Sequence, residues 1–170
     1  AAACARGIEA VGAVELFARV ARAPVVAITG ANGKSTVTSL VGEMCREAGF
    51  DTAVGGNIGV PVLDLLRAPE PDVYVLELSS FQLETTMSLN ARAAAVLNIV
   101  PDHMDRYATL ADYAAAKARI FRGDGTMILN ADDPVVLAMG LPGRSTVRFG
   151  ANPPASDIDY GLVAHGGETW

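Results

Sequence analysis

Lysine is scarce in this sequence of 170 residues: Lys34 and Lys117 are the only lysines among 13 lysine and arginine residues. Arginine therefore carries most of the positive charge. It does not replace a lysine amine, which can lose its proton when buried. Both lysines are therefore candidates for a chemical role.

Cysteine and excess basic charge are scarce as well. Two cysteines, Cys4 and Cys45, do not make a disulfide framework, so a cytoplasmic protein is the default expectation. A net charge of −6 and an isoelectric point near 4.8 argue against a nucleic-acid-binding surface. No apolar run approaches the roughly 18 residues that a membrane span needs. Because the chain as a whole is negatively charged, any phosphate of a substrate would have to be bound by a local site.

The apolar content is sufficient for one compact domain. It amounts to 51% of the residues, with a mean hydropathy of +0.30, which indicates a sizeable core; we expect a monomer. The chain begins at Ala1 with no initiator methionine or signal-peptide pattern, and it stops at Trp170 within an expected hairpin. We interpret it as a piece of a longer protein.

Apolar strands alternate with helical patterns along most of the chain. Helices are expected at 8–21, 35–48, 60–66, 109–122 and 132–139, and strands at 25–29, 51–56, 72–78, 93–100, 126–130 and 145–150. This alternation predicts an α/β fold with a mostly parallel sheet covered by helices on both faces. Residues 157–170 suggest an antiparallel hairpin with a Gly-Gly turn, which would begin a small antiparallel subsheet at the C-terminal end.

The segment "TGANGKST" has the features of a phosphate-binding loop. Gly33, Lys34 and Ser35 match the end of a Walker A motif. Ile28 occupies the position of the motif's first glycine, and Gly30, three residues before Gly33, is the nearest glycine instead. A strand, a tight turn and a helix N-terminus would still aim backbone N–H groups at one point. The expected nucleotide-binding residues are Gly30, Ala31, Asn32, Gly33, Lys34, Ser35 and Thr36.

Polar residues follow the ends of the other expected strands. Asn57 lies in "GGNIGVP", Glu77 interrupts the apolar run "DVYVLEL", and His103 belongs to "PDHMDRY". Singly, they could be a turn former, a solvent-facing charge and a loop histidine. Together they would line one crevice at the carboxyl edge of the sheet, where a carboxylate and an imidazole suit Mg²⁺ better than zinc.

Lys117 falls in the middle of the apolar stripe of its expected helix rather than at the edge. One interpretation is a snorkelling lysine whose head reaches water. The other is a functional lysine whose pKa is lowered by burial. A neutral lysine amine can react with CO₂, and the resulting carbamate is a metal ligand.

Five segments in order carry a resemblance to a known family: "TGANGKST", "GGNIGVP", "VLELSSFQLE", "NIVPDHMDRY" and "YAAAKARI". The chain resembles the central ATP-binding domain of the Mur ligases, a P-loop NTPase-like fold, over nearly its whole length. The segment "LELSSFQLE" is similar to that of the members that add D-glutamate to UDP-N-acetylmuramoyl-L-alanine in peptidoglycan precursor synthesis. One departure is Ala31, where the family usually has threonine.

The resemblance implies ATP and Mg²⁺ as cofactors and an acyl-phosphate intermediate that the amine of D-glutamate attacks. It implies catalytic roles for Lys34, His103 and a carbamylated Lys117. The implied metal ligands are Ser35, Thr36, Glu77, His103 and Lys117, and the implied substrate contacts are Asn57, Ser79 and His103.

The resemblance also implies a domain division. Residues 1–22 would be the end of an N-terminal domain and its linker, and 23–170 a central domain truncated at its C-terminus. The missing N- and C-terminal domains would bind the UDP-sugar peptide and D-glutamate. Three alternatives stay open: a small-molecule kinase, a folylpolyglutamate synthetase-like ligase and a non-catalytic nucleotide-binding fragment.

Overall fold

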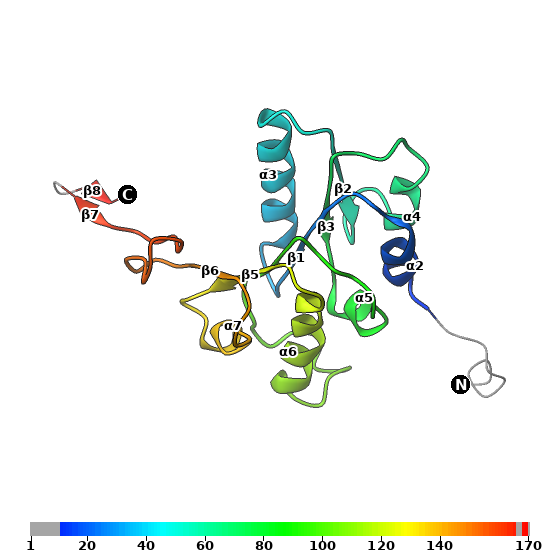
Figure 1. The fold of residues 1–170 in the computed structure, drawn as a ribbon. Coiled ribbons are helices and arrows are strands. Elements are labelled where there is room, and N and C mark those ends of the chain that lie inside the picture. The colour runs from blue at the N-terminus through cyan, green and yellow to red at the C-terminus, as the bar shows by residue number, and fades with distance from the viewer. Residues whose placement is uncertain (1–10, 166–167, 170) are drawn as a thin grey trace.

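The structure is a computed structural model that describes residues 11–165 and 168–169, and its centre is a six-stranded sheet (Figure 1). All neighbouring strands run parallel, in the order β2-β3-β1-β4-β5-β6. The strands are β1 (Val25–Thr29), β2 (Thr52–Gly56), β3 (Val73–Glu77), β4 (Ala93–Val96), β5 (Thr126–Asn130) and β6 (Thr146–Phe149). The predicted parallel α/β sheet is confirmed.

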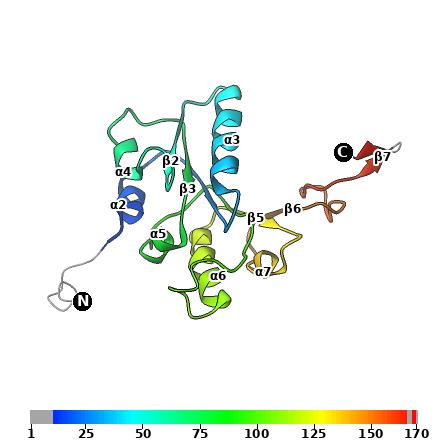
Figure 2. The ribbon, with the colours of Figure 1, turned by 180° about the vertical axis from the view of Figure 1, so that it is seen from behind.

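Helices cover the two faces of the sheet unequally, as Figures 1 and 2 show from opposite sides. On one face lies α3 (Lys34–Glu47), the longest described helix. The other face carries α2 (Ala13–Val20), α4 (Val62–Leu65), α5 (Ser80–Glu84), α6 (Leu110–Ala118), the 3-10 turn η1 (Arg119–Phe121) and α7 (Pro134–Leu137). No helix among the described residues is long and apolar enough to cross a membrane.

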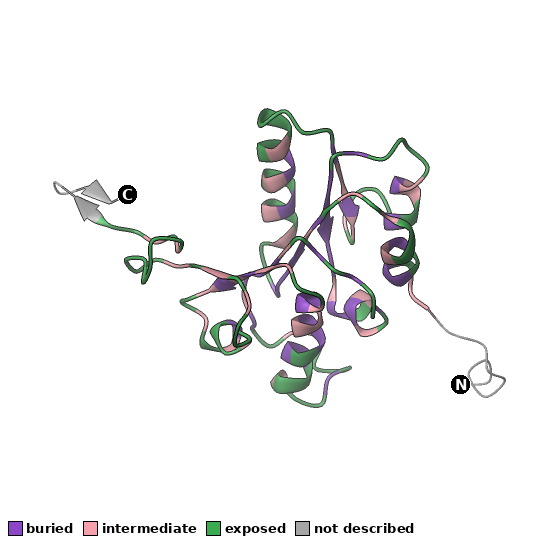
Figure 3. Cartoon of the chain, in the orientation of Figure 1, coloured by how far each residue is buried: buried purple, intermediate pink, exposed green. Residues whose placement is uncertain are grey.

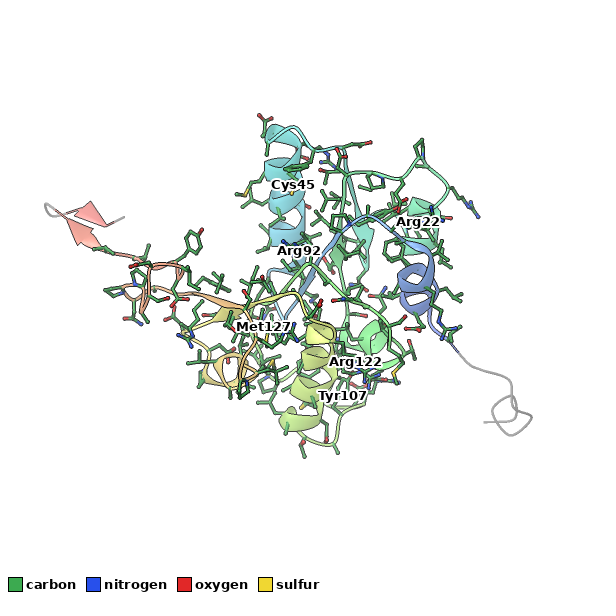
Figure 4. All side chains as sticks on the ribbon, in the orientation of Figure 1. Arg22, Cys45, Arg92, Tyr107, Arg122 and Met127 are labelled. Carbon is green, nitrogen blue, oxygen red and sulfur yellow. The ribbon has the colours of Figure 1, made fainter. Side chains whose placement is uncertain are left out.

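Alternate strand residues point into two separate cores. In β5, Met127 and Leu129 belong to the larger core beneath α6 and α7, whereas Ile128 packs in the smaller core beneath α3. Figure 3 shows burial concentrated along the strands, and Figure 4 labels Met127 and, on α3, the partly buried Cys45. Consecutive residues therefore reach opposite faces of the sheet.

The strand order places β1 between β3 and β4, so the chain leaves β1 toward one edge and later returns to its other side. Such a reversal of strand order opens a crevice at the carboxyl ends of the central strands. Gly33, with a φ of 78°, is the N-cap of α3 in this region, and Gly49, with a φ of 91°, ends the helix as expected.

The structure differs from the expected elements in two places. The segment Ser80–Glu84 forms α5, a helix that the sequence analysis did not predict; Ser79 caps it through a reciprocal capping box with Gln82. Residues 157–163 form a turn and an extended segment instead of a hairpin strand, and Tyr160 makes a parallel bridge to Phe149.

Of the antiparallel hairpin expected at 157–170, the structure shows only a short pairing of two residues from each strand. Two short strands, β7 (Ala164–His165) and β8 (Glu168–Thr169), pair antiparallel as a separate sheet. The expected Gly-Gly turn at 166–167 lies outside the described residues, and a larger antiparallel subsheet stays a prediction.

Helix α2 is built into the main core, although it precedes the first strand. Val14 and Phe17 are buried there, and the Phe17 ring meets Tyr74 of β3 edge-on at 4.9 Å between centroids. Glu15 is also buried, with 2% exposure; its carboxylate accepts backbone N–H bonds from Met87 (2.6 Å) and Ser88 (2.9 Å).

These contacts stabilise the charged form of Glu15. The backbone N–H groups of Met87 and Ser88 are the main cause that lowers the pKa of Glu15 to about 2, and hydrogen bonds from Arg19 and the Ser88 hydroxyl add to it. A depressed carboxyl pKa stabilises the folded state above the unfolded pKa, and this contribution disappears as the pH falls toward 2.

We expect Glu15→Gln to lower the free energy of unfolding near neutral pH by about 2 kcal/mol, because a charged acceptor of backbone hydrogen bonds is lost. Thermal unfolding measured from pH 7 down to pH 2.5 should show the difference from wild type shrinking below about pH 4.5. Glu47→Gln, an exposed site on α3, is the matched control. A difference that stays constant over this range would contradict the charge-based account.

Candidate functional site

The loop between β1 and α3 is attached to the end of β4 by Asn98. The Ala31 N–H donates to the Asn98 carbonyl oxygen (3.0 Å), and the Asn32 N–H donates to the Asn98 side-chain oxygen (2.8 Å). The Asn98 side-chain nitrogen donates in return to the Asn32 carbonyl (3.1 Å). The sequence analysis assigned these two amides to phosphate, but both donate to Asn98 instead. The amides available for an anion are therefore those of Gly33 and the first turn of α3.

Both lysines of the chain donate to carbonyl groups of the same loop. The Lys34 Nζ lies 2.9 Å from the Ala31 carbonyl oxygen, and the Lys117 Nζ lies 2.9 Å from that of Gly30. The two ammonium groups therefore flank the loop from different helices.

Lys117 is not a snorkelling lysine, because only 2% of it is exposed. Its Nζ also lies 3.4 Å from the Thr29 hydroxyl and 4.7 Å from the centroid of the Tyr113 ring. Burial, together with the positive charge of Lys34, lowers the pKa of Lys117 to about 8, while the charges of Asp102 and Glu77 act in the opposite direction. Burial therefore favours the neutral amine at this position more than at an exposed lysine.

Glu77 ends β3 on the face that carries α3, and it is 1% exposed. Its carboxylate accepts hydrogen bonds from the Ser35 hydroxyl (2.7 Å) and the Asn57 side-chain nitrogen (2.8 Å). The Asn57 N–H also donates to the Glu77 carbonyl oxygen (2.8 Å), and the strands can approach this closely because Gly56, whose φ is 111°, has no Cβ; one would lie 2.2 Å from that oxygen. Within the described part of the chain, no basic side chain forms an ion pair with Glu77.

A cavity of about 230 Å³ opens beside these groups. Its lining comprises Lys34, Asn57, Ser79, Ser80, Phe81, His103, Tyr113 and Lys117. Five residues predicted from separate segments thus meet at one cavity, and Ser35 and Glu77 adjoin it through Asn57. Thr36 is exposed on α3 and is not part of the lining. A larger hollow of about 450 Å³ at the opposite end of the strands contains none of the predicted residues.

His103 reaches the cavity from a tight turn after β4. Its φ of 53° is positive, and its carbonyl oxygen accepts N–H bonds from Arg106 (2.9 Å) and Tyr107 (3.1 Å). The imidazole lies 4.8 Å from the Phe81 ring between centroids, and its Nε2 is 3.6 Å from an Asp102 carboxylate oxygen.

The donor set fits a nucleotide phosphate with a hard cation. Free N–H groups at the start of a 14-residue helix and the Lys34 ammonium suit an anion. The buried Glu77 carboxylate, which has only neutral donors among the described contacts, suits Mg²⁺ next to the Ser35 hydroxyl. The described residues contain no group of three or more His, Cys, Asp or Glu side chains placed for a metal, so phosphate oxygens and water would complete such a site.

Four residues of the site were missed by sequence reasoning: Asn98 beside the loop, and Ser80, Phe81 and Tyr113 in the cavity lining. Asn98 interrupts the apolar run "AAAVLNIV" at a strand end, which is the same signal that singled out Glu77. The Tyr113 ring packs in the core, as expected of an aromatic residue on the apolar side of its helix, while one face meets the Lys117 ammonium. No sequence signal distinguishes that second role.

Comparison with known proteins supports a single family. The Mur ligase middle domain matches residues 28–167. UDP-N-acetylmuramoylalanine--D-glutamate ligase of Nitrosococcus oceani is 59% identical over 169 residues, which are 99% of this chain and 37% of that protein. The protein of the same name from Methylobacillus flagellatus is 60% identical over 171 residues, 99% of this chain and 38% of that protein. The chain thus spans little more than a third of these relatives.

Solved structures share the fold at lower identity. A pseudomurein peptide ligase type C from Methanothermus fervidus has a TM-score of 0.65 at 25% identity, over 81% of this chain and 29% of that chain. The MurF ligase from Thermotoga maritima in complex with ADP has a TM-score of 0.68 at 18% identity, over 92% of this chain and 40% of that chain. The loop, the cavity and the matched residues lead to one conclusion: this chain belongs to the Mur ligase family, as its middle domain.

Proposed function

We propose that this chain is the ATP-binding domain of a ligase that adds D-glutamate to UDP-N-acetylmuramoyl-L-alanine in peptidoglycan precursor synthesis. The observation that carries the proposal is the cavity shared by Lys34, His103 and Lys117 beside the phosphate loop. The specificity for D-glutamate rests on relatives of that name with 59–60% identity over 99% of the chain. We assign residues 1–22 to the end of an N-terminal domain and linker, and the reaction to a cytoplasmic monomer.

The proposed role of the loop is to bind the β- and γ-phosphates of ATP. Gly30, Ala31, Asn32 and Gly33 shape it, and the amides of Lys34, Ser35 and Thr36 have no acceptor within their helix. Lys34 would exchange its bond to the Ala31 carbonyl for the phosphate oxygens. This would neutralise charge that develops during phosphoryl transfer.

Mg²⁺ would neutralise phosphate charge and orient the γ-phosphoryl group. The residues proposed to hold Mg²⁺ are Ser35, Thr36, Glu77, His103 and Lys117, the last as a carbamate. Ser35 and Glu77 are supported most directly, because their oxygens lie 2.7 Å apart beside the loop. The proposed substrate contacts are Asn57, Ser79 and His103, all of which line the cavity.

The reaction would proceed in two displacements. A carboxylate oxygen of the UDP-sugar peptide attacks the γ-phosphorus, and ADP leaves. The amine of D-glutamate then attacks the acyl carbon, phosphate leaves and the amine loses a proton. The cations around the cavity bring the anionic carboxylate and phosphate together, which is the main electrostatic obstacle to the first displacement.

Carbamylation of Lys117 is supported by its chemistry. A neutral amine attacks the carbon of CO₂, a C–N bond forms and a proton passes to solvent. The pKa of about 8 makes the neutral amine accessible, and the adjacent cation site would stabilise the negative product. The modification converts a buried cation into an anion that can ligate metal.

The experiment that tests the function is an assay of the full-length ligase with ATP and a panel of UDP-muramoyl substrates and amino acids. We expect ADP, phosphate and an amide product in equal amounts, and only with UDP-N-acetylmuramoyl-L-alanine and D-glutamate together. A phosphorylated product that persists with D-glutamate present would indicate a kinase, and turnover driven by a folate would indicate a folylpolyglutamate synthetase-like ligase. ATP binding without turnover would indicate a non-catalytic module.

Lys34→Ala should lower turnover in this assay by about 100-fold or more, since a positive charge at the transferred phosphate is lost. Steady-state kinetics with saturating ATP measure the effect. Arg67→Ala removes an exposed cation on the surface and should leave turnover unchanged. Unchanged turnover in Lys34→Ala would refute the assigned phosphate loop.

Asn98→Ala should raise the KM for ATP about 10-fold with little change in melting temperature, because two hydrogen bonds that hold the loop are lost. Asn98→Asp keeps the acceptor for the Asn32 N–H and loses only the donor to the Asn32 carbonyl, so its KM for ATP should rise less than that of Asn98→Ala. Asn90→Ala, at the opposite end of β4, removes an acceptor for the Asp124 N–H and is the matched control. Equal KM values in all three variants would remove the positioning role of Asn98.

Lys117→Ala should lose most ligase activity, and millimolar formate or acetate should restore part of it if a carboxylate-like group acts there. Initial rates with and without the added anion give the rescue. Lys34→Ala under the same conditions should gain nothing, because it lacks a cation rather than an anion. Absence of rescue together with loss of nucleotide binding would favour a packing role for Lys117.

A further inference from the structure

We propose that Glu84 is a positioning residue that holds His103 at the cavity by clamping the turn from His103 to Tyr107. This inference rests on the proposed ligase function for its kinetic consequences, but its structural claim does not. Glu84 is not among the residues that line the cavity, and its carboxylate bonds to Arg106 and Tyr107, so it would act through the turn.

The Glu84 carboxylate holds both residues at the far end of the turn. One oxygen accepts the Tyr107 hydroxyl at 2.5 Å, and the other forms an ion pair and hydrogen bond with the Arg106 guanidinium. The bond from Arg106 is the main cause that lowers the pKa of Glu84, so the clamp contains a carboxylate. Charge-assisted bonds of this kind are among the stronger hydrogen bonds.

These two residues are bonded directly to His103. The N–H groups of Arg106 and Tyr107 both donate to the His103 carbonyl oxygen, which closes a single compact turn. His103 is also the only non-glycine residue with a positive φ among the described residues. Such a conformation persists where surrounding contacts impose it, and the Glu84 clamp is the contact that closes this turn from outside.

A second contact from the same helix holds the near side of the turn. Phe81 lies three residues before Glu84, on the same side of α5. The Arg106 guanidinium lies 4.8 Å from the Phe81 centroid, and the His103 ring lies 4.8 Å from it as well. The Phe81 ring therefore packs against both the His103 imidazole and the Arg106 guanidinium.

Helix α5 is itself firmly attached at its C-terminal end. Arg119 donates to the carbonyl oxygens of Leu83 (2.8 Å) and Thr86 (3.3 Å), and Glu15 of α2 accepts the next two N–H groups along the chain. Figure 4 labels Tyr107 and Arg122, which lie near α5 and α6 in that view. Glu84 thus projects from a fixed base, so its removal should release the turn and leave the helix in place.

The test compares Glu84→Ala with the full-length wild-type ligase. We expect kcat/KM to fall about 10- to 100-fold, as for a catalytic group displaced by about 1 Å. Tyr107→Phe removes one of the clamp bonds, and its kcat/KM should fall less than that of Glu84→Ala. Glu43→Ala breaks an exposed ion pair with Arg46 on α3 and should leave both activity and melting temperature unchanged.

A double-mutant cycle with His103→Ala separates positioning from general destabilisation. In the His103→Ala background, Glu84→Ala should lower kcat/KM by less than about 2-fold, because its effect passes through the missing imidazole. If the double variant loses kcat/KM by the product of the two single losses, the two residues act independently and the proposal is overturned. If Glu84→Ala does not fold, Glu84→Gln, which keeps the side-chain volume, takes its place in the same cycle.

Histidine NMR supplies a readout that does not depend on ligase activity. The His103 imidazole signal is the one that disappears in His103→Ala, and Glu84→Ala should shift or broaden it while other histidine signals, including that of His165, stay in place. An unmoved His103 signal would overturn the clamp, whatever the kinetics show. A moved signal in a protein without ligase activity would uphold the clamp and refute the proposed function.

Discussion

Three consecutive carbonyl groups of the loop after β1 each accept a hydrogen bond from a different side chain. Lys117 reaches Gly30, Lys34 reaches Ala31 and Asn98 reaches Asn32. Because the carbonyls are held in this way, the loop has a defined shape before any ligand arrives. Its remaining N–H groups lie at the start of α3, where the helix dipole favours an anion. Preorganisation of this kind lowers the free-energy cost of ordering the site when a phosphate binds.

The carboxyl edge of the sheet lets both faces contribute to one cavity. Glu77 points toward α3, whereas Lys117 belongs to α6 on the opposite face, and the loop after β1 passes between them. Each charge is buried, but the two are accommodated differently. Glu77 has two neutral donors, and Lys117 has a carbonyl, a hydroxyl and an aromatic ring. Buried charges without ion pairs are costly in structural positions, which favours a functional reason for both.

The parallel sheet and most of the site could be predicted from the sequence, because charged or polar residues inside apolar runs mark buried functional positions. Glu77 and Lys117 are of this kind, and Asn98 carried the same signal without being used. Helix α5 was missed because five residues are too short for a periodic pattern, although Ser79 and Gln82 form its capping box. The role of Glu84 could not be predicted, since it depends on contacts across 22 and 23 residues that no local pattern encodes.

The docking of α2 bears on how this domain can be shortened. The family match begins at residue 28, inside β1, yet Val14 and Phe17 fill the large core and Glu15 ties down the segment after α5. A version trimmed to the matched boundary would expose the Tyr74 side of the sheet and leave the amides of Met87 and Ser88 without their acceptor. The smallest piece that keeps this core intact should therefore start ahead of α2, a limit for expression that the family match alone does not provide.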